Sequence, residues 1–271
     1  MTIAELRGKI SSSGQNLTDT SEDLLTSDVF GCLRYVSPEC GLVQFLQTAT
    51  TLSKSEFFTP RPIVRAHWSF WPSIRFPGRT PCQPDVVIGL ESEKGLHIVM
   101  IEAKYLSEKS SYENESEHPN DQLARELHNL EALGPSDLGW KTTKEVVDRS
   151  LVYLTQDVSI PLTALQESLQ EYRRKRNRVG TIYWTSWRYL EAILEEQSRG
   201  VDAYQATVLN DIKLLLEKKW LTMFHGMAPL TTSFDKGTYT FYSLSLARYD
   251  WPDILSALES MPIYSYMGGK R

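Results

Sequence analysis

Long hydrophobic runs are missing from this sequence of 271 residues. No stretch approaches the roughly 20 consecutive apolar residues that a membrane-spanning helix needs. The first residues do not resemble a secretory signal, because Lys9 and the polar stretch after it interrupt a very short apolar start. Internal repeats and long low-complexity tracts are absent as well. These absences favour a cytoplasmic protein that has no membrane partner.

Cysteine and histidine are scarce, and glycine-rich motifs are absent. The chain has three cysteines and five histidines, and neither set shows the paired spacing of a zinc site. It also lacks a phosphate-binding glycine loop, a dinucleotide fingerprint and the G-x-S-x-G motif of serine hydrolases. We expect the cysteines to be reduced, partly buried thiols. They are Cys32, Cys40 and Cys82.

Positive charge is in the minority, since the formal net charge is −5 at pH 7. The surface as a whole therefore does not favour nucleic-acid binding, although a basic face can exist locally. One basic cluster ends a predicted helix, in the segment "EYRRKRNR". Part of it is explained by the preference of cations for a helix C-terminus. The remainder fits non-specific, salt-sensitive contacts with phosphates. The cluster comprises Arg173, Arg174, Lys175, Arg176 and Arg178.

Hydrophobic periodicity predicts an α/β protein with a sizeable core, since 41% of the residues are hydrophobic. An antiparallel hairpin that leads into alternating strands and helices implies a mixed β-sheet. We expect four or five strands flanked by helices on both faces. The predicted helices cover residues 20–36, 39–52, 121–133, 161–177, 188–198 and 202–220, and the predicted strands lie within 61–74, 83–105, 149–155 and 180–187.

Composition divides the chain into three parts. Residues 1–20 are small and polar, and we expect a flexible N-terminal arm there. Residues 21–200 contain the predicted sheet and most of its helices. Residues 201–271 are expected to add a helix and a small α/β extension packed on the core. A hairpin and a further helix are predicted within residues 222–271 of that extension.

Three charged residues occur in the predicted hairpin "QPDVVIGLESEKGLHIVMIEAKY". Alternate residues of a strand share a face, so Glu102 and Lys104 stand side by side. With "SEKG" as the turn, Asp85 lies roughly opposite them. A lone buried carboxylate there is costly, whereas two carboxylates suit a divalent cation that meets a scissile phosphate. Lys104 would orient or help to deprotonate the attacking water and neutralise the phosphate. The alternative is a solvated Glu–Lys pair beside an unrelated Asp.

Pro84–Asp85 and Glu102–Lys104 resemble the paired motifs of the PD-(D/E)XK nuclease superfamily, which also lie on two strands of a hairpin. The resemblance covers residues 20 to about 195. It implies a restriction-endonuclease-like core and hydrolysis of DNA phosphodiester bonds with Mg²⁺ or Mn²⁺. It also implies that Asp85 and Glu102 bind the metal and that Lys104 is the catalytic lysine.

Two helical positions match the superfamily as well. Many members have a glutamate on the first core helix, and Glu22 is the matching candidate for a further metal ligand, with Asp23 as its rival. The alternative for Glu22 is an acid favoured at a helix N-terminus. Several branches have a glutamine on the helix after the motif strands, and Gln122 fits that place. It would hydrogen-bond a water or a phosphate near the metal. Its alternative is an exposed helical glutamine.

These features lead to two functional hypotheses. The first is a metal-dependent endonuclease or exonuclease that hydrolyses DNA, with defence against foreign DNA as its setting. The second is a nuclease-like subunit that binds DNA or a partner protein without cutting. The overall acidity and the poorly assignable C-terminal extension favour it, because such tails often dock partner proteins. A plainer alternative is an α/β protein whose charged hairpin end is a solvated pair. A homodimer would suit duplex cutting, which usually needs two sites. The sequence leaves the form of the nucleic acid open.

Overall fold

The computed structural model describes residues 17–107, 109 and 118–223. These residues belong to a single unit of the fold, which extends to Phe224. The arm was predicted at residues 1–20; residues 1–16 lie outside the described residues, whereas residues 17–20 are helical, so the prediction is wrong for them. The hairpin and helix predicted within residues 222–271 fall outside the described residues from residue 224 onward. Within the described part of the chain, no helix has both the length and the apolar character needed to cross a bilayer.

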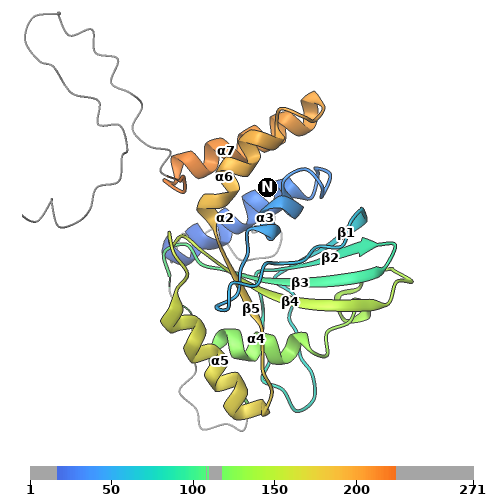
Figure 1. The fold of residues 1–271 in the computed structure, drawn as a ribbon, viewed down its shortest axis with the longest axis vertical. Helices are drawn as coiled ribbons and strands as arrows, with labels where there is room; N and C mark the ends of the chain where they lie inside the picture. Colours follow the sequence, from blue (N-terminus) through green and yellow to red (C-terminus); the bar gives the residue numbers. More distant parts are fainter. Residues whose placement is uncertain (1–16, 108, 110–117, 224–271) are drawn as a thin grey trace, which may run out of the picture. The chain divides into compact units, whose positions relative to one another are not determined.

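A mixed five-stranded sheet forms the centre of the fold and confirms the predicted fold class (Figure 1). The strands lie side by side in chain order. The first three form an antiparallel meander, whereas the third, fourth and fifth are parallel. The strands are β1 (Ile63–Phe70), β2 (Val86–Ser92), β3 (Gly95–Ala103), β4 (Val146–Thr155) and β5 (Ile182–Ser186).

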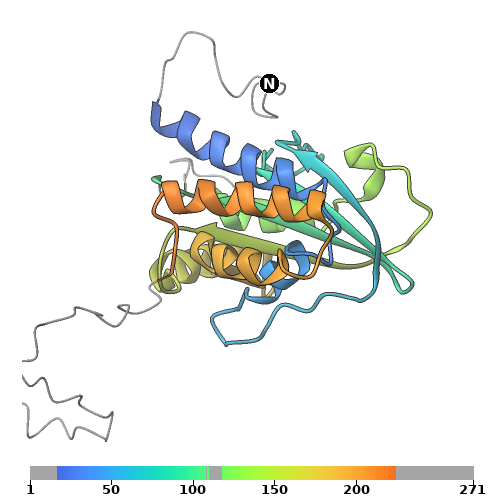
Figure 2. The ribbon, with the colours of Figure 1, turned by 90° about the horizontal axis from the view of Figure 1, so that it is seen from above.

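Helices cover both faces of this sheet (Figure 1). Figure 2 shows α7 between α2 and α6, and this layer packs on one face together with the short α3. The opposite face is covered by α4 and α5. The helices are α2 (Leu17–Leu33), α3 (Leu42–Gln47), α4 (Gln122–Leu130), α5 (Leu162–Arg176), α6 (Trp187–Gln197), α7 (Ala203–Lys218) and the 3₁₀ helix η1 (Pro135–Leu138).

The β2–β3 hairpin has the register that brings the charged residues together. Pairing runs without a shift from a two-residue turn to the pair Val86 and Ile101. Extending this register by one residue places Asp85 opposite Glu102. Because register decides which side chains share a face, the hairpin alone sets these two carboxyl groups on the same side of the sheet.

Side chains of the central strand β3 alternate between two hydrophobic cores. Ile101 faces the core beneath α2, α6 and α7, whereas Met100 faces the core beneath α4 and α5. Glu102 continues the second series, and its partner on β4 is Tyr153. The side chain of Glu102 therefore points toward the α4 layer. The earlier β3 residues on this face are apolar, so Glu102 continues a hydrophobic row with a carboxylate.

Two helix boundaries differ from the sequence prediction. The helix predicted at residues 39–52 is wrong in extent, because α3 ends at Gln47. Beyond it, Thr50 exchanges two backbone hydrogen bonds with Trp184, of 2.9 and 2.8 Å, and bridges Glu56. This pairing extends the chain and leaves no room for another helical turn. Helix α2 begins at Leu17 and ends at Leu33, whereas the sequence predicted a helix at residues 20–36.

Helix α7 completes the core instead of lying outside it. Its apolar side chains Leu209, Ile212 and Leu216 are buried in the same cluster as residues of α2, α6 and the sheet. Each such side chain contributes roughly 1.5–3 kcal/mol by leaving water. The helix predicted at residues 202–220 is thus present, and it stabilises the layer on which Glu22 lies.

Candidate active site

Asp85 is fixed at the end of the hairpin by two hydrogen bonds. It follows Pro84 directly and its side chain is buried. The indole N–H of Trp71 donates to Oδ1 over 3.0 Å, and the backbone N–H of Ala103 donates to Oδ2 over 2.8 Å. Burial, reinforced by the charge of Glu102, raises the pKa of Asp85 well above its usual value. The carboxyl group is therefore both oriented by the protein and destabilised in its charged form.

Glu102 and Lys104 form an ion pair where β3 ends. Nζ of Lys104 lies 2.7 Å from Oε1 of Glu102, and the exposed fractions of the two side chains are 11% and 2%. Burial by itself lowers the pKa of Lys104. The surrounding carboxylates, with Glu102 foremost, outweigh burial and raise the pKa above its usual value. Lys104 is therefore a cation at neutral pH.

Helix α4 brings two further polar side chains to Glu102. The carboxylate of Asp121 caps the helix, because its Oδ1 accepts from the N–H of Ala124 at 3.1 Å. Gln122 is the next residue, and its Nε2 donates to Oε1 of Glu102. Glu126 lies one turn later on the same face of the helix. A side-chain hydrogen bond joins Glu126 to Glu102.

The carboxyl groups of Glu102 and Glu126 lie close together, and both are buried. Oε2 of each residue is buried, and neither oxygen meets a hydrogen-bond donor among the described residues. Burial, which the hydrogen bond to Glu102 only partly offsets, raises the pKa of Glu126 to about 7. Burial and the neighbouring charge of Glu126 likewise raise the pKa of Glu102. Several acids thus crowd around the single ammonium of Lys104.

Glu22 reaches the site from the opposite helical layer, on α2. Its Oε1 lies 3.3 Å from Nζ of Lys104. Its Oε2 accepts from the backbone N–H of Tyr105 at 3.0 Å and from the hydroxyl of Ser107. The predicted residue is therefore part of the cluster. These contacts hold Lys104 and the chain after β3, and a role of Glu22 as a metal ligand stays a prediction.

The basic cluster lies apart from these carboxylates. Four of its residues form the last turn of α5, whereas residues 161–167 at the start of α5 lie near Lys104. At about 1.5 Å per residue, the two ends of this helix are roughly 15–20 Å apart. Nη1 of Arg178 lies 3.5 Å from Oε1 of Glu131. Binding of phosphates by the cluster stays a prediction, and any such phosphate would lie several nucleotides from Lys104.

The oxygen donors of the site fit a divalent metal ion. Mg²⁺ usually takes one or two protein carboxylates and completes its coordination with water and substrate phosphate. Asp85 and Glu102 can supply such a pair, and the unpartnered Oε2 of Glu102 is a free acceptor in the described structure. Within the described ranges, no group of three or more His, Cys, Asp or Glu side chains forms a ready cage for a metal. The residues can supply two carboxylate ligands, and the binding of a metal ion stays a prediction.

Trp71 and Glu126 belong to the site although sequence reasoning did not select them. Trp71 is a buried aromatic residue, and its indole also holds Asp85. Glu126 lies on the same helix as Gln122. The sequence did contain a signal for it, since residues four apart on a helix share a face and Gln122 was already a candidate.

Comparisons of the chain with protein-family models, with curated proteins and with solved structures give no match. The resemblance to PD-(D/E)XK nucleases accordingly rests on the two short sequence motifs and stays a prediction.

Proposed function

We propose that this chain is a metal-dependent nuclease that hydrolyses phosphodiester bonds in DNA. The observation that carries the proposal is the convergence of Asp85, Glu102 and Lys104 at one edge of adjacent strands. Gln122 joins them from α4. Paired carboxylates suit a hard cation, and a buried ammonium beside them suits a phosphate.

The residues divide between metal binding, charge stabilisation and positioning. Mg²⁺ or Mn²⁺ held by Asp85 and Glu102 would stabilise developing charge on the phosphate and acidify an attacking water. Lys104 is protonated, so it supplies positive charge beside the phosphate instead of accepting a proton from water. Gln122 orients Glu102 by its hydrogen bond. Glu22 orients Lys104 and the chain that follows β3.

A nuclease-like subunit that binds DNA or a partner protein without cutting is the second candidate. The contact of 2.7 Å between Lys104 and Glu102 favours it, because the ammonium already balances a carboxylate without a metal. A buried pair of this kind can persist for structural reasons alone.

The substitution Glu102→Gln tests the proposal with little change in shape. The amide oxygen can still accept from Lys104 and Gln122, and the amide nitrogen can donate to Glu126. Only the charge is lost. We expect cleavage of DNA with Mg²⁺ or Mn²⁺ to fall at least about 100-fold while the melting temperature changes little.

Glu91→Gln is the matched control, since Glu91 is a buried carboxylate on β2 that accepts from His67 near the other end of the hairpin. It should leave cleavage unchanged. The assay should include single-stranded, duplex and branched DNA, and RNA. A wild-type protein that binds DNA but cuts none of these substrates would support the non-cleaving subunit. Absence of both cleavage and salt-sensitive binding would leave the plain α/β protein.

A further inference from the structure

A pocket of about 590 Å³ opens beside Lys104 on the α5 side of the site. Its walls are the segment after β3 (residues 104–107 and 109), the end of β4 with the following loop (153 and 155–157), and the start of α5 (161, 163, 164 and 167). Pockets of this size commonly hold one small organic molecule. Because Lys104 belongs both to the lining of this pocket and to the candidate active site, a ligand in the pocket would lie next to the proposed site of cleavage.

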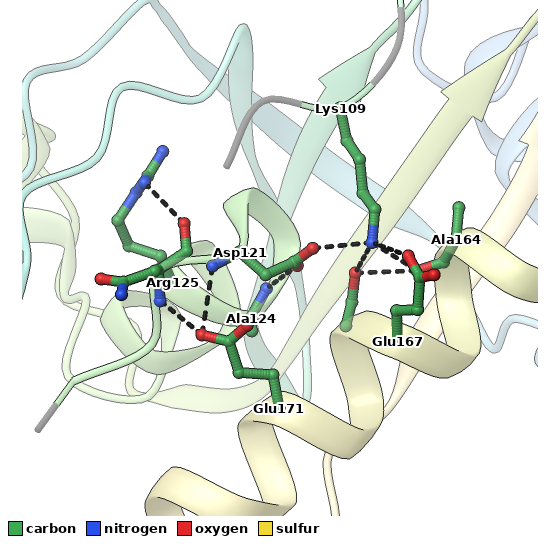
Figure 3. Close-up of polar contacts among 9 residues, drawn as sticks. Lys109, Asp121, Ala124, Arg125, Ala164, Glu167 and Glu171 are labelled. Carbon is green, nitrogen blue, oxygen red and sulfur yellow. Dashed lines mark hydrogen bonds and ion pairs between the residues drawn. The ribbon is translucent and has the colours of Figure 1, made fainter. Parts of the chain in front are cut away.

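One wall of the pocket is held in place by Lys109 (Figure 3). Its Nζ lies 2.7 Å from Oδ2 of Asp121 and 2.9 Å from the carbonyl oxygen of Ala164. The hydroxyl of Ser168 and a carboxylate oxygen of Glu167 lie 3.1 and 3.2 Å away. The ammonium is thus satisfied by the protein, and it ties this wall to the residue that caps α4.

The charges on the lining argue against a phosphate as the occupant. Two cations, Lys104 and Lys109, are matched by two acids, Asp157 and Glu167. Lys109 contacts Glu167, and Lys104 is already paired with acids of the neighbouring cluster. Apart from Lys104, which would face the phosphate of the proposed cleavage site, the cation of the lining is Lys109, and Glu167 and Asp121 already balance it.

The lining is instead suited to an uncharged, polar aromatic ring. Tyr105, Tyr153 and Leu106 supply apolar surface, whereas Gln156 and Thr163 supply hydrogen-bonding groups. Stacking on aromatic side chains is the usual way in which proteins hold unpaired bases.

The hydroxyl of Tyr153 is the observation that points to a ligand. The residue is only 4% exposed and lines the pocket. Among the described residues its hydroxyl has no hydrogen-bond partner. The hydroxyl oxygen is not among the fully enclosed atoms, so it offers the pocket a hydrogen-bonding group that the protein leaves unused and that an acceptor atom of a bound base would meet.

We propose that this pocket receives one unpaired nucleobase from the DNA strand whose phosphate lies at Lys104. The substrate would then be a single strand or a strand end, because a base inside a continuous duplex cannot enter a side pocket without leaving its stack. This inference rests on the proposed nuclease function and adds to it the form of the substrate.

The test compares cleavage of a single-stranded oligonucleotide with cleavage of a covalently closed duplex circle that contains the same sequence and has no strand ends. Thr163→Trp would fill the pocket from the exposed start of α5. We expect the ratio of kcat/KM for single strand over duplex to fall at least about tenfold in this variant. Tyr153→Phe, which removes only the hydroxyl, should lower the same ratio several-fold. The control Leu162→Trp alters the neighbouring exposed residue, which does not line the pocket, and should leave both rates unchanged.

Binding without cleavage separates the two proposals. A fluorescein-labelled single-stranded pentanucleotide, measured by anisotropy in EDTA, should bind more weakly to Thr163→Trp than to the wild type. If DNA is cut but neither variant changes the substrate ratio or the anisotropy, the pocket proposal is overturned and the nuclease stands. If nothing is cut but the pentanucleotide binds in a Thr163-dependent way, the nuclease proposal fails and the base pocket stands.

Discussion

The ammonium of Lys104 lies 2.7 Å from Oε1 of Glu102, at the point where the central strand β3 ends. Strand, helix α4 and helix α2 all meet at this pair, because Gln122 and Glu22 contact it from opposite faces of the sheet. A substitution of Lys104 or Glu102 should therefore alter the proposed cleavage activity at a position that both helical layers hold in place.

Lys104→Met keeps the length of the side chain and removes its charge. We expect cleavage to fall by about 100-fold or more, since positive charge beside a reacting phosphate stabilises the transition state. Single-turnover cleavage at saturating metal measures this directly. Lys94→Met, in the exposed turn of the same hairpin, is the control and should cleave as the wild type does. Full activity of Lys104→Met would remove the lysine from the mechanism.

Gln122→Met should weaken binding of Mn²⁺ about 10- to 100-fold, because the amide that orients Glu102 is lost. Calorimetric titration of the protein with Mn²⁺ gives the affinity. Gln166→Met, at an exposed position of α5, provides a matched change that should leave the affinity as it is. Equal affinities in all three proteins would show that Gln122 does not position a ligand.

Binding of a divalent cation should tighten as the pH rises from 6 to 8. Burial raises the pKa of Asp85 and of Glu102, so each carboxyl retains its proton to a higher pH than usual. A metal ion can bind only after it displaces such protons. Because binding releases protons, the affinity for the metal rises as the pH rises. Titrations in two buffers with different ionisation enthalpies would count the protons. An affinity that stays constant over this range contradicts the assignment of ligands.

Stability should fall as the pH drops from 6.5 to 4, and His128 should account for part of the fall. Burial, together with the charges of Arg79 and Arg176, lowers the pKa of His128 to about 4. At pH values between about 4 and 6.5, His128 binds a proton in the unfolded chain but not in the folded chain. Lowering the pH in this range therefore favours unfolding. The contribution reaches at most about 3 kcal/mol.

His128→Leu should make this part of the pH dependence disappear. Urea unfolding at pH 7.5, 5.5 and 4.5 measures it as the difference between variant and wild type. We expect that difference to shift in favour of the variant with each step toward acid. Parallel pH profiles for the two proteins would show that His128 titrates normally in the folded state.

Lys109→Met should destabilise the fold by on the order of 2–3 kcal/mol. The substitution leaves the buried carboxylate of Asp121 without its counter-charge and releases the start of α5. Chemical denaturation measures the loss. Arg174→Met removes an exposed cation at the other end of α5 and should change stability by less than about 0.5 kcal/mol.

The hairpin and the fold class could be predicted because their signals are local. A two-residue turn between two apolar runs fixes the register, and the register alone sets Asp85 opposite Glu102. The end of α3 could not be predicted in this way. Thr50 leaves the helical pattern because it pairs with Trp184, which is distant in the sequence.

The periphery of the site depends on packing that composition does not encode. A glutamate on an amphipathic helix is ordinarily assigned to solvent, because burying a carboxylate is unfavourable. Glu126 is buried nevertheless, since the docking of α4 turns its polar face toward Glu102. The bond from Trp71 to Asp85 likewise joins a residue after β1 to one before β2. Such contacts follow from tertiary structure and become visible only there.

The turn at Glu93 and Lys94 is exposed and lies at the opposite end of the hairpin from the acids. Seven strand residues, at about 3.3 Å each, separate it from Asp85 by roughly 23 Å. A fluorophore attached there would be carried by strands that are buried along their whole length and would lie far from Asp85 and Glu102. The same turn offers a point of immobilisation that leaves the proposed active site accessible.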